Sequence, residues 1–66
     1  MFGKVKWYDN ARGFGYIESE QGSDVFFNRT AVENSGRVSL SRGMHIEFDL
    51  VKKGHENQAV NLHVLA

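Results

Sequence analysis

Four aromatic side chains of this chain are well suited to bind flat ligands by stacking: Trp7, Phe14, Tyr16 and Phe26. Phe14 and Tyr16 are two positions apart in the run Arg12-Gly13-Phe14-Gly15-Tyr16-Ile17, so on a strand both rings point to one face. The same alternation assigns Phe26 to the outer face, and Trp7 is expected near it. A nucleobase that covers such a ring contributes about 1–3 kcal/mol. The four rings therefore predict a surface for single-stranded nucleic acid.

Charged and polar side chains accompany these rings. Lys6 and Arg12 flank them and are expected to meet phosphates, each adding about −0.7 to the salt dependence of single-strand binding. A guanidinium stacks on a base or pairs with a phosphate, and we hypothesise that Arg29 and Arg37 exchange stacking for charge, which weakens binding at high salt. Asn28 has two readings, as a reader of a base edge or as a polar, outward-facing strand residue.

Catalytic and metal-binding arrangements are not found in the sequence. His45, His55 and His63 lie on separate segments, with no cysteine and no known ligand spacing, so no metal is expected. The serines fall in polar turns or loops, where hydroxyls commonly satisfy backbone groups. Gly13 and Gly15 do not form a phosphate-binding loop because no helix is expected after them. We therefore expect neither an enzyme nor a cofactor.

Length, composition and charge limit the class of protein. The 66 residues are expected to form one domain over residues 1–66, stabilised by packing because there is no cysteine. Eight basic and eight acidic residues give zero net charge, so attraction for phosphate must be local. No apolar run approaches the ~20 residues of a membrane span, and the first residues do not resemble a signal peptide. A cytoplasmic protein without a membrane partner is expected.

The rings must be positioned by short strands. Five segments alternate or are rich in β-branched and aromatic residues, and turn-forming residues separate them; they span residues 3–8, 14–18, 25–28, 45–50 and 59–64. A polar turn is expected over residues 52–57. The long connection over residues 29–43 is expected to hold a helical turn around Thr30-Ala31-Val32. This pattern predicts an all-β fold, a five-stranded antiparallel Greek-key barrel of the oligonucleotide-binding (OB) type.

Alternation within these strands also predicts the core. On the first strand Val5 faces inward, and Lys6 or Trp7 lies near the outer face. The residues expected inside are Val5, Ile17, Val25, Phe27, Ile46, Phe48, Leu50, Val60, Leu62 and Val64. Because this set already fills a small barrel, the four aromatic rings are expected on the surface rather than in the core.

Three segments, in order, resemble the bacterial cold-shock protein (cold-shock domain) family: Lys4-Val5-Lys6-Trp7, the run from Arg12 to Ile17, and Asp24-Val25-Phe26-Phe27. The similarity covers nearly the whole chain. It implies a barrel that binds single-stranded RNA and DNA on the face of its first three strands, and an RNA chaperone of the stress response. It also implies binding roles for Lys6, Trp7, Phe14, Tyr16, Asp24 and Phe26, with Arg12 where the family commonly has lysine.

The chain resembles a divergent member of that family. Asn28 and Arg29 stand where the family usually has His-Phe, Arg37 stands where it usually has an aromatic residue, and Asp9 replaces the more common Asn. We expect binding of single-stranded RNA and DNA with little sequence selectivity and a preference for pyrimidine-rich strands. The alternative is a divergent barrel whose aromatic and arginine face contacts a protein. A monomer is expected, with a domain-swapped dimer through residues 29–43 as the alternative.

Overall fold

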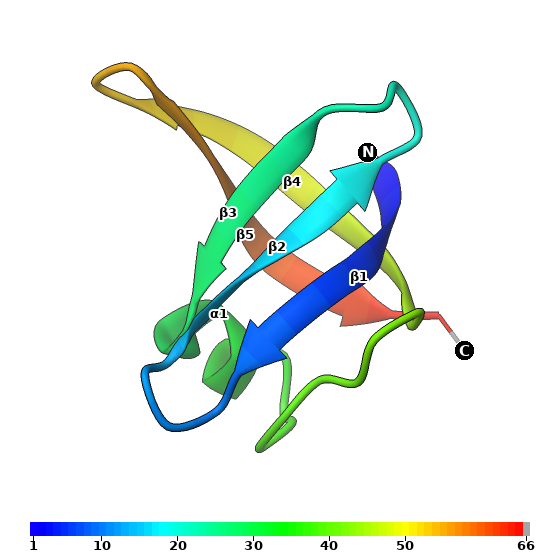
Figure 1. Cartoon of the computed structure of the whole chain (residues 1–66), viewed down its shortest axis with the longest axis vertical. Helices are drawn as coiled ribbons and strands as arrows, with labels where there is room; N and C mark the ends of the chain where they lie inside the picture. Colours follow the sequence, from blue (N-terminus) through cyan, green and yellow to red (C-terminus); the bar gives the residue numbers. More distant parts are fainter. Residues whose placement is uncertain (66) are drawn as a thin grey trace.

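Five strands and one short helix follow one another in the computed structural model, which describes residues 1–65 (Figure 1). They are β1 (Phe2–Asp9), β2 (Phe14–Ser19), β3 (Asp24–Asn28), α1 (Arg29–Asn34), β4 (His45–Lys53) and β5 (Glu56–Val64). The strands form a closed barrel in the order β1-β2-β3-β5-β4. All neighbouring strands are antiparallel except β3 and β5, which are parallel. The predicted fold class is confirmed.

The hairpin between β4 and β5 is tighter than predicted. Both strands continue through most of the expected turn, with Lys52 opposite Asn57 and Lys53 opposite Glu56. Only Gly54 and His55 remain in the turn, and Gly54 has a φ of 63°, which a glycine adopts without steric strain. The prediction of a long turn over residues 52–57 was wrong because polar strand residues at an exposed hairpin tip resemble turn residues in composition.

Most of the predicted core is buried, and the exceptions lie on β4 and β5. Leu50 is 41% exposed, where β4 continues toward the protruding hairpin (Figure 1). On β5 the buried residues are Ala59 and Leu62, and Val60 is only partly buried. Asn61 has a φ of 54°, and the pairing of β4 with β5 shifts register close to it. The buried positions of β5 are therefore Ala59 and Leu62, three residues apart, and the prediction that Leu50 and Val60 are buried was wrong. Val64, also predicted inside, is partly buried and packs against the core.

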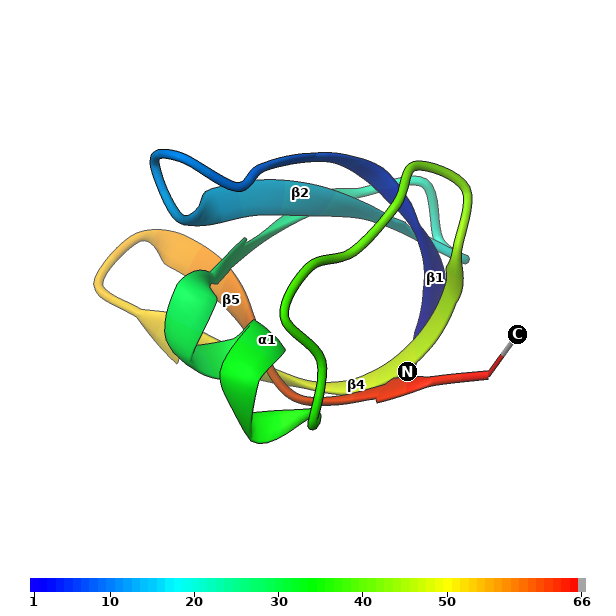
Figure 2. The ribbon, with the colours of Figure 1, turned by 90° about the horizontal axis from the view of Figure 1, so that it is seen from below.

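The helix and the connection after it complete the core. Ala31 and Val32 of α1 are buried, as is Leu40 of the following connection. Seen from below, α1 and this connection lie across one open end of the barrel (Figure 2). The expected helical turn is therefore a six-residue helix that covers apolar side chains at that end. No helix formed by residues 1–65 is long and apolar enough to span a membrane.

Candidate nucleic-acid interface

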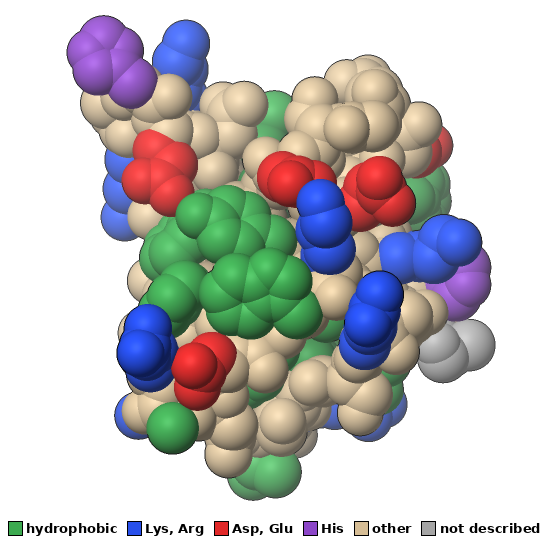
Figure 3. Space-filling view, in the orientation of Figure 1, with side chains coloured by type: hydrophobic (Ala, Val, Ile, Leu, Met, Phe, Trp, Pro, Cys, Tyr) green, Lys and Arg blue, Asp and Glu red, His purple; other side chains and the backbone are tan. Residues whose placement is uncertain are grey.

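Four aromatic rings from three adjacent strands lie together on one face; we call Trp7, Phe14, Tyr16 and Phe26 the aromatic platform. The ring centroids of Trp7 lie 5.4 Å from Phe14 and 5.5 Å from Tyr16. Those of Phe26 lie 6.0 Å from Phe14 and 5.9 Å from Tyr16. On the face formed by β1, β2 and β3, Figure 3 shows a continuous apolar surface with charged side chains around it. The arrangement offers adjacent ring surfaces to planar ligands.

The strand register explains why these rings meet. Tyr16 lies opposite Trp7 on one side and opposite Phe26 on the other, so the three side chains share a face. Trp7 is 40% exposed, and the other three rings are partly buried against one another. Residues on the opposite face of the same strands, such as Ile17 and Val25, are fully enclosed.

An irregularity in β1 places two consecutive side chains on the outer face. The pairing of β1 with β2 shifts register between Val5 and Trp7, as at a β-bulge. Val5 is buried before the shift, and the ring of Tyr8 stacks on the buried Phe27 after it, at 5.4 Å between centroids. Lys6 and Trp7 are both exposed. The sequence left the choice between Lys6 and Trp7 open, and the structure exposes both.

Gly15 lets the strands approach closely beneath the platform. A Cβ atom at this position would lie 2.3 Å from the carbonyl oxygen of Trp7 and 2.9 Å from the ring of Phe27. Such distances are far below van der Waals contact, so a larger residue would separate β1 from β2. The glycine between Phe14 and Tyr16 is therefore required by packing.

Two exposed ion pairs border the platform. Lys6 Nζ of β1 lies 3.0 Å from Asp24 Oδ2 of β3, so this pair reaches across β2. Arg12 Nε lies 3.7 Å from Asp9 Oδ2, and the Arg12 side chain is 76% exposed. Exposed pairs of this kind contribute only about 0–1 kcal/mol. Both cations therefore remain available to a phosphate that competes with the carboxylate.

Arg29 and Arg37 come together beside the loop that joins β1 to β2. With Asn10, Glu33 and neighbouring residues they line a groove of about 500 Å³. Arg29 Nη2 donates hydrogen bonds to the carbonyl oxygens of Asn10 at 2.7 Å and Ala11 at 3.3 Å. Sequence reasoning did not select Asn10, because a turn asparagine gives no sign that a distant arginine will bind its carbonyl.

Asn28 caps the helix. Its Oδ1 accepts a hydrogen bond from the backbone N–H of Ala31 at 3.1 Å, which satisfies one of the free donors at the start of α1. Its side chain is partly buried at the end of β3, opposite Phe14. The oxygen of Asn28 therefore has a structural role, and its amide N–H₂ is the part suited to a base edge.

Replacing Asn28 by alanine should lower the stability by about 1 kcal/mol, or about 4–8 °C in the melting temperature, because the cap is lost. Asn28→Asp keeps an acceptor oxygen and should keep most of the stability. Thermal unfolding followed by circular dichroism measures both. Equal melting temperatures for the original chain and Asn28→Ala would show that the cap contributes nothing.

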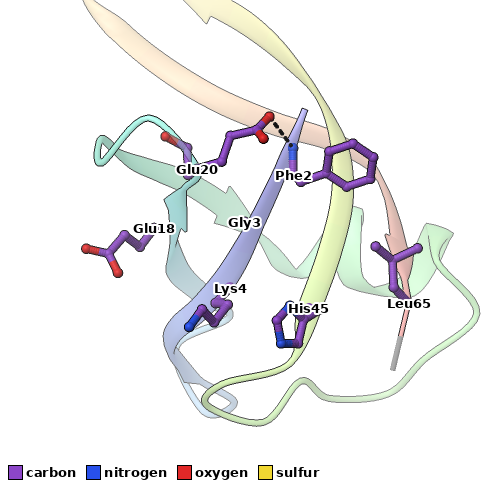
Figure 4. A pocket seen from close by; sticks show the side chains of 8 residues that line it. Phe2, Gly3, Lys4, Glu18, Glu20, His45 and Leu65 are labelled. Carbon is purple, nitrogen blue, oxygen red and sulfur yellow. Dashed lines mark hydrogen bonds between the residues drawn. The ribbon is translucent and has the colours of Figure 1, made fainter.

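A second hollow lies away from the platform, between the start of β1 and the start of β4. It has a volume of about 370 Å³, and the exposed side chains of Phe2 and Leu65 line it. Figure 4 shows Lys4 and His45 side by side there, with the carboxylate of Glu18 turned away from them. Within residues 1–65, no three His, Cys, Asp or Glu side chains gather as metal ligands would.

Known proteins resemble this chain over almost its whole length. The family model of the 'Cold-shock' DNA-binding domain matches residues 1–65. The chain is 47% identical over 60 residues to cold shock protein CspD of Bacillus subtilis and 45% identical over 60 residues to cold shock protein CspB of Geobacillus stearothermophilus, with 91% of both chains covered in each case. It is 44% identical over 65 residues to cold shock-like protein CspA of Rickettsia bellii, which covers 97% of this chain and 93% of the relative. These matches confirm the resemblance that the motifs indicated.

Proposed function

The chain belongs to the cold-shock domain family, and from that premise we propose that it binds single-stranded RNA and DNA on the aromatic platform and acts as an RNA chaperone. The observation that carries the proposal is the contact of Trp7, Phe14, Tyr16 and Phe26 across three adjacent strands. Every base has a π face, so stacking of this kind tolerates changes of sequence. A preference for pyrimidine-rich strands would follow from stacking geometry.

The chaperone activity requires no energy source. Bases that stack on the platform must be unpaired, so the protein binds the open strand and not the hairpin. Binding to one state of an equilibrium stabilises that state by about 2.7 kcal/mol when the free protein is at 100 times its dissociation constant. Intramolecular base pairs of that stability would open by mass action.

The polar part of the proposed site lies around the platform. Lys6 and Arg12 contact phosphates in exchange for their carboxylate partners Asp24 and Asp9. Arg37 contacts the bound nucleic acid from the groove beside the β1–β2 loop. The amide N–H₂ of Asn28 meets a base edge. Asp24 takes part by holding Lys6 at the platform until a phosphate replaces it.

Fluorescence of Trp7, the single tryptophan of the chain, tests the proposal directly. Adding single-stranded oligothymidine should quench its emission to saturation, whereas a blunt DNA duplex of equal phosphate content should not. A fluorophore-labelled RNA hairpin with a short stem should open as the protein is added. Absence of quenching and of hairpin opening at micromolar protein would refute nucleic-acid binding and favour a protein partner for this face.

Replacing Arg37 by alanine should make the salt dependence of oligothymidine binding shallower by about 0.7 in log K against log salt, because one phosphate contact is lost. Arg12→Ala should have a similar effect. The matched control is Arg42→Ala, since Arg42 lines neither the groove nor the platform. The measurement is Trp7 quenching at several salt concentrations. A slope equal to that of the original chain would remove Arg37 from the site.

We also propose that residues 1–66 act as one domain and as a monomer in the cytoplasm. Ala31, Val32 and Leu40 are buried against the core of the same chain, so the connection that a domain swap would exchange is already packed. Light scattering at the concentrations used for binding should give the mass of one chain. The mass of two chains would instead favour a swapped dimer.

A further inference from the structure

We infer that Arg29 is a positioning residue, which fixes the β1–β2 loop in the conformation that binds nucleic acid. This inference rests on the proposed function and assigns to Arg29 a role other than direct contact with the ligand. Arg29 begins α1, immediately after β3, whereas the loop lies between β1 and β2. The contacts between them therefore join parts of the chain that are distant in sequence.

Three hydrogen bonds connect Arg29 to the loop. Its side-chain Nη2 donates to the carbonyl oxygens of Asn10 and Ala11, and its backbone N–H donates to the carbonyl oxygen of Gly13 at 2.8 Å. One nitrogen thus holds two successive carbonyl groups. A planar guanidinium has the donor geometry for this, whereas an ammonium on a flexible chain does not fix two acceptors in the same way.

Gly13 shows how closely the guanidinium lies against the loop. A Cβ atom built on Gly13 would lie 3.2 Å from Cζ, Nε and Nη2 of Arg29, so the glycine leaves room for the group to rest on the backbone. Gly13 also has a φ of 78°, a conformation that other residues rarely adopt. The loop and the arginine therefore fit each other.

The loop held in this way carries part of the proposed binding site. Arg12 is at its exposed turn, and Phe14 of the platform follows Gly13 at the start of β2. Asp9 Oδ1 fixes the other end by accepting hydrogen bonds from the N–H groups of Ala11 and Arg12, both at 3.0 Å. A loop ordered before binding loses less conformational entropy when the ligand arrives.

Arg29 is suited to this role because its acceptors are neutral. The ion pairs found within residues 1–65 are those of Lys6 and Arg12, so no carboxylate in the described part of the chain forms an ion pair with Arg29. Its Nη2 hydrogens are already used inside the protein. A phosphate that took them would release the loop that presents Arg12.

The variants Arg29→Ala and Arg29→Lys test the inference, with Arg12→Ala as the matched control on the same loop. Trp7 quenching by oligothymidine at several salt concentrations gives affinity and salt slope, and NMR relaxation of the backbone N–H groups of residues 10–13 gives the mobility of the free loop. Arg29→Ala should lower the affinity by about 3- to 10-fold, with the salt slope unchanged and the loop more mobile. Arg29→Lys should loosen the loop as well, although it keeps the charge.

Arg12→Ala should instead make the salt slope shallower by about 0.7 and leave the loop ordered. A shallower slope and an ordered loop in Arg29→Ala would show direct phosphate contact and overturn the inference. Full affinity in Arg29→Ala or Arg29→Lys would overturn it too. If the original chain does not bind oligothymidine, both the proposed function and the binding role of Arg29 are wrong. The relaxation data do not depend on binding: if Arg29→Ala leaves the free loop as ordered as in the original chain, the hydrogen bonds of Arg29 do not hold the loop, whether or not the protein binds oligothymidine.

Discussion

Affinity for oligothymidine should fall by at least about 30-fold when Phe14 and Phe26 are both replaced by alanine, because each stacked base contributes about 1–3 kcal/mol. The two rings are adjacent, at 6.0 Å between centroids and 23° between planes, so their loss removes two of the four neighbouring rings of the platform. Trp7 remains as the reporter. Its quenching by oligothymidine at fixed salt measures the change.

The matched control for this variant is Phe2→Ala. Phe2 is also an aromatic residue of the barrel surface and is 47% exposed, but it lines the hollow beside His45 rather than the platform. Its removal should leave the affinity unchanged. Thermal unfolding of each variant separates loss of binding from loss of fold. A folded double variant that binds as tightly as the original chain would show that these rings do not stack on bases.

Phe27→Ala should leave the chain largely unfolded at 25 °C. Phe27 is 1% exposed, and removing a buried phenylalanine side chain destabilises a protein by about 3–5 kcal/mol. A chain below roughly 70–80 residues rarely has more than about 3–5 kcal/mol of stability from its core. The substitution therefore removes most or all of the free energy that favours the folded chain over the unfolded one. Far-UV circular dichroism and urea unfolding measure the result.

The neighbouring variant Phe26→Ala is the internal comparison. Phe26 and Phe27 are the same residue type on the same strand, with Phe26 partly exposed and Phe27 enclosed. Phe26→Ala should stay folded and bind more weakly, whereas Phe27→Ala should lose the fold. Similar unfolding free energies for the two variants would contradict the assignment of one ring to the surface and the other to the core.

The sequence alone determined which side chains face outward on β2 and β3, where the alternation continues through the whole strand. The side-chain period of two predicts Phe14, Tyr16 and Phe26 on one side of the sheet, and Val25 and Phe27 on the other. Glycines and polar residues between the strands separated the five segments, and their number and spacing predicted an OB barrel. This information is local, because it depends on residues that are neighbours in the chain.

Tertiary structure decided the features that depend on pairing between distant segments. The bulge that exposes both Lys6 and Trp7 arises from the register of β1 against β2, and the shift near Asn61 changed which residues of β5 are buried. The Lys6–Asp24 ion pair spans a strand, and Arg29 binds carbonyl groups 18 and 19 positions away. Pairing of neighbouring strands brings these groups together, and no local periodicity encodes which carbonyl or carboxylate a side chain will meet.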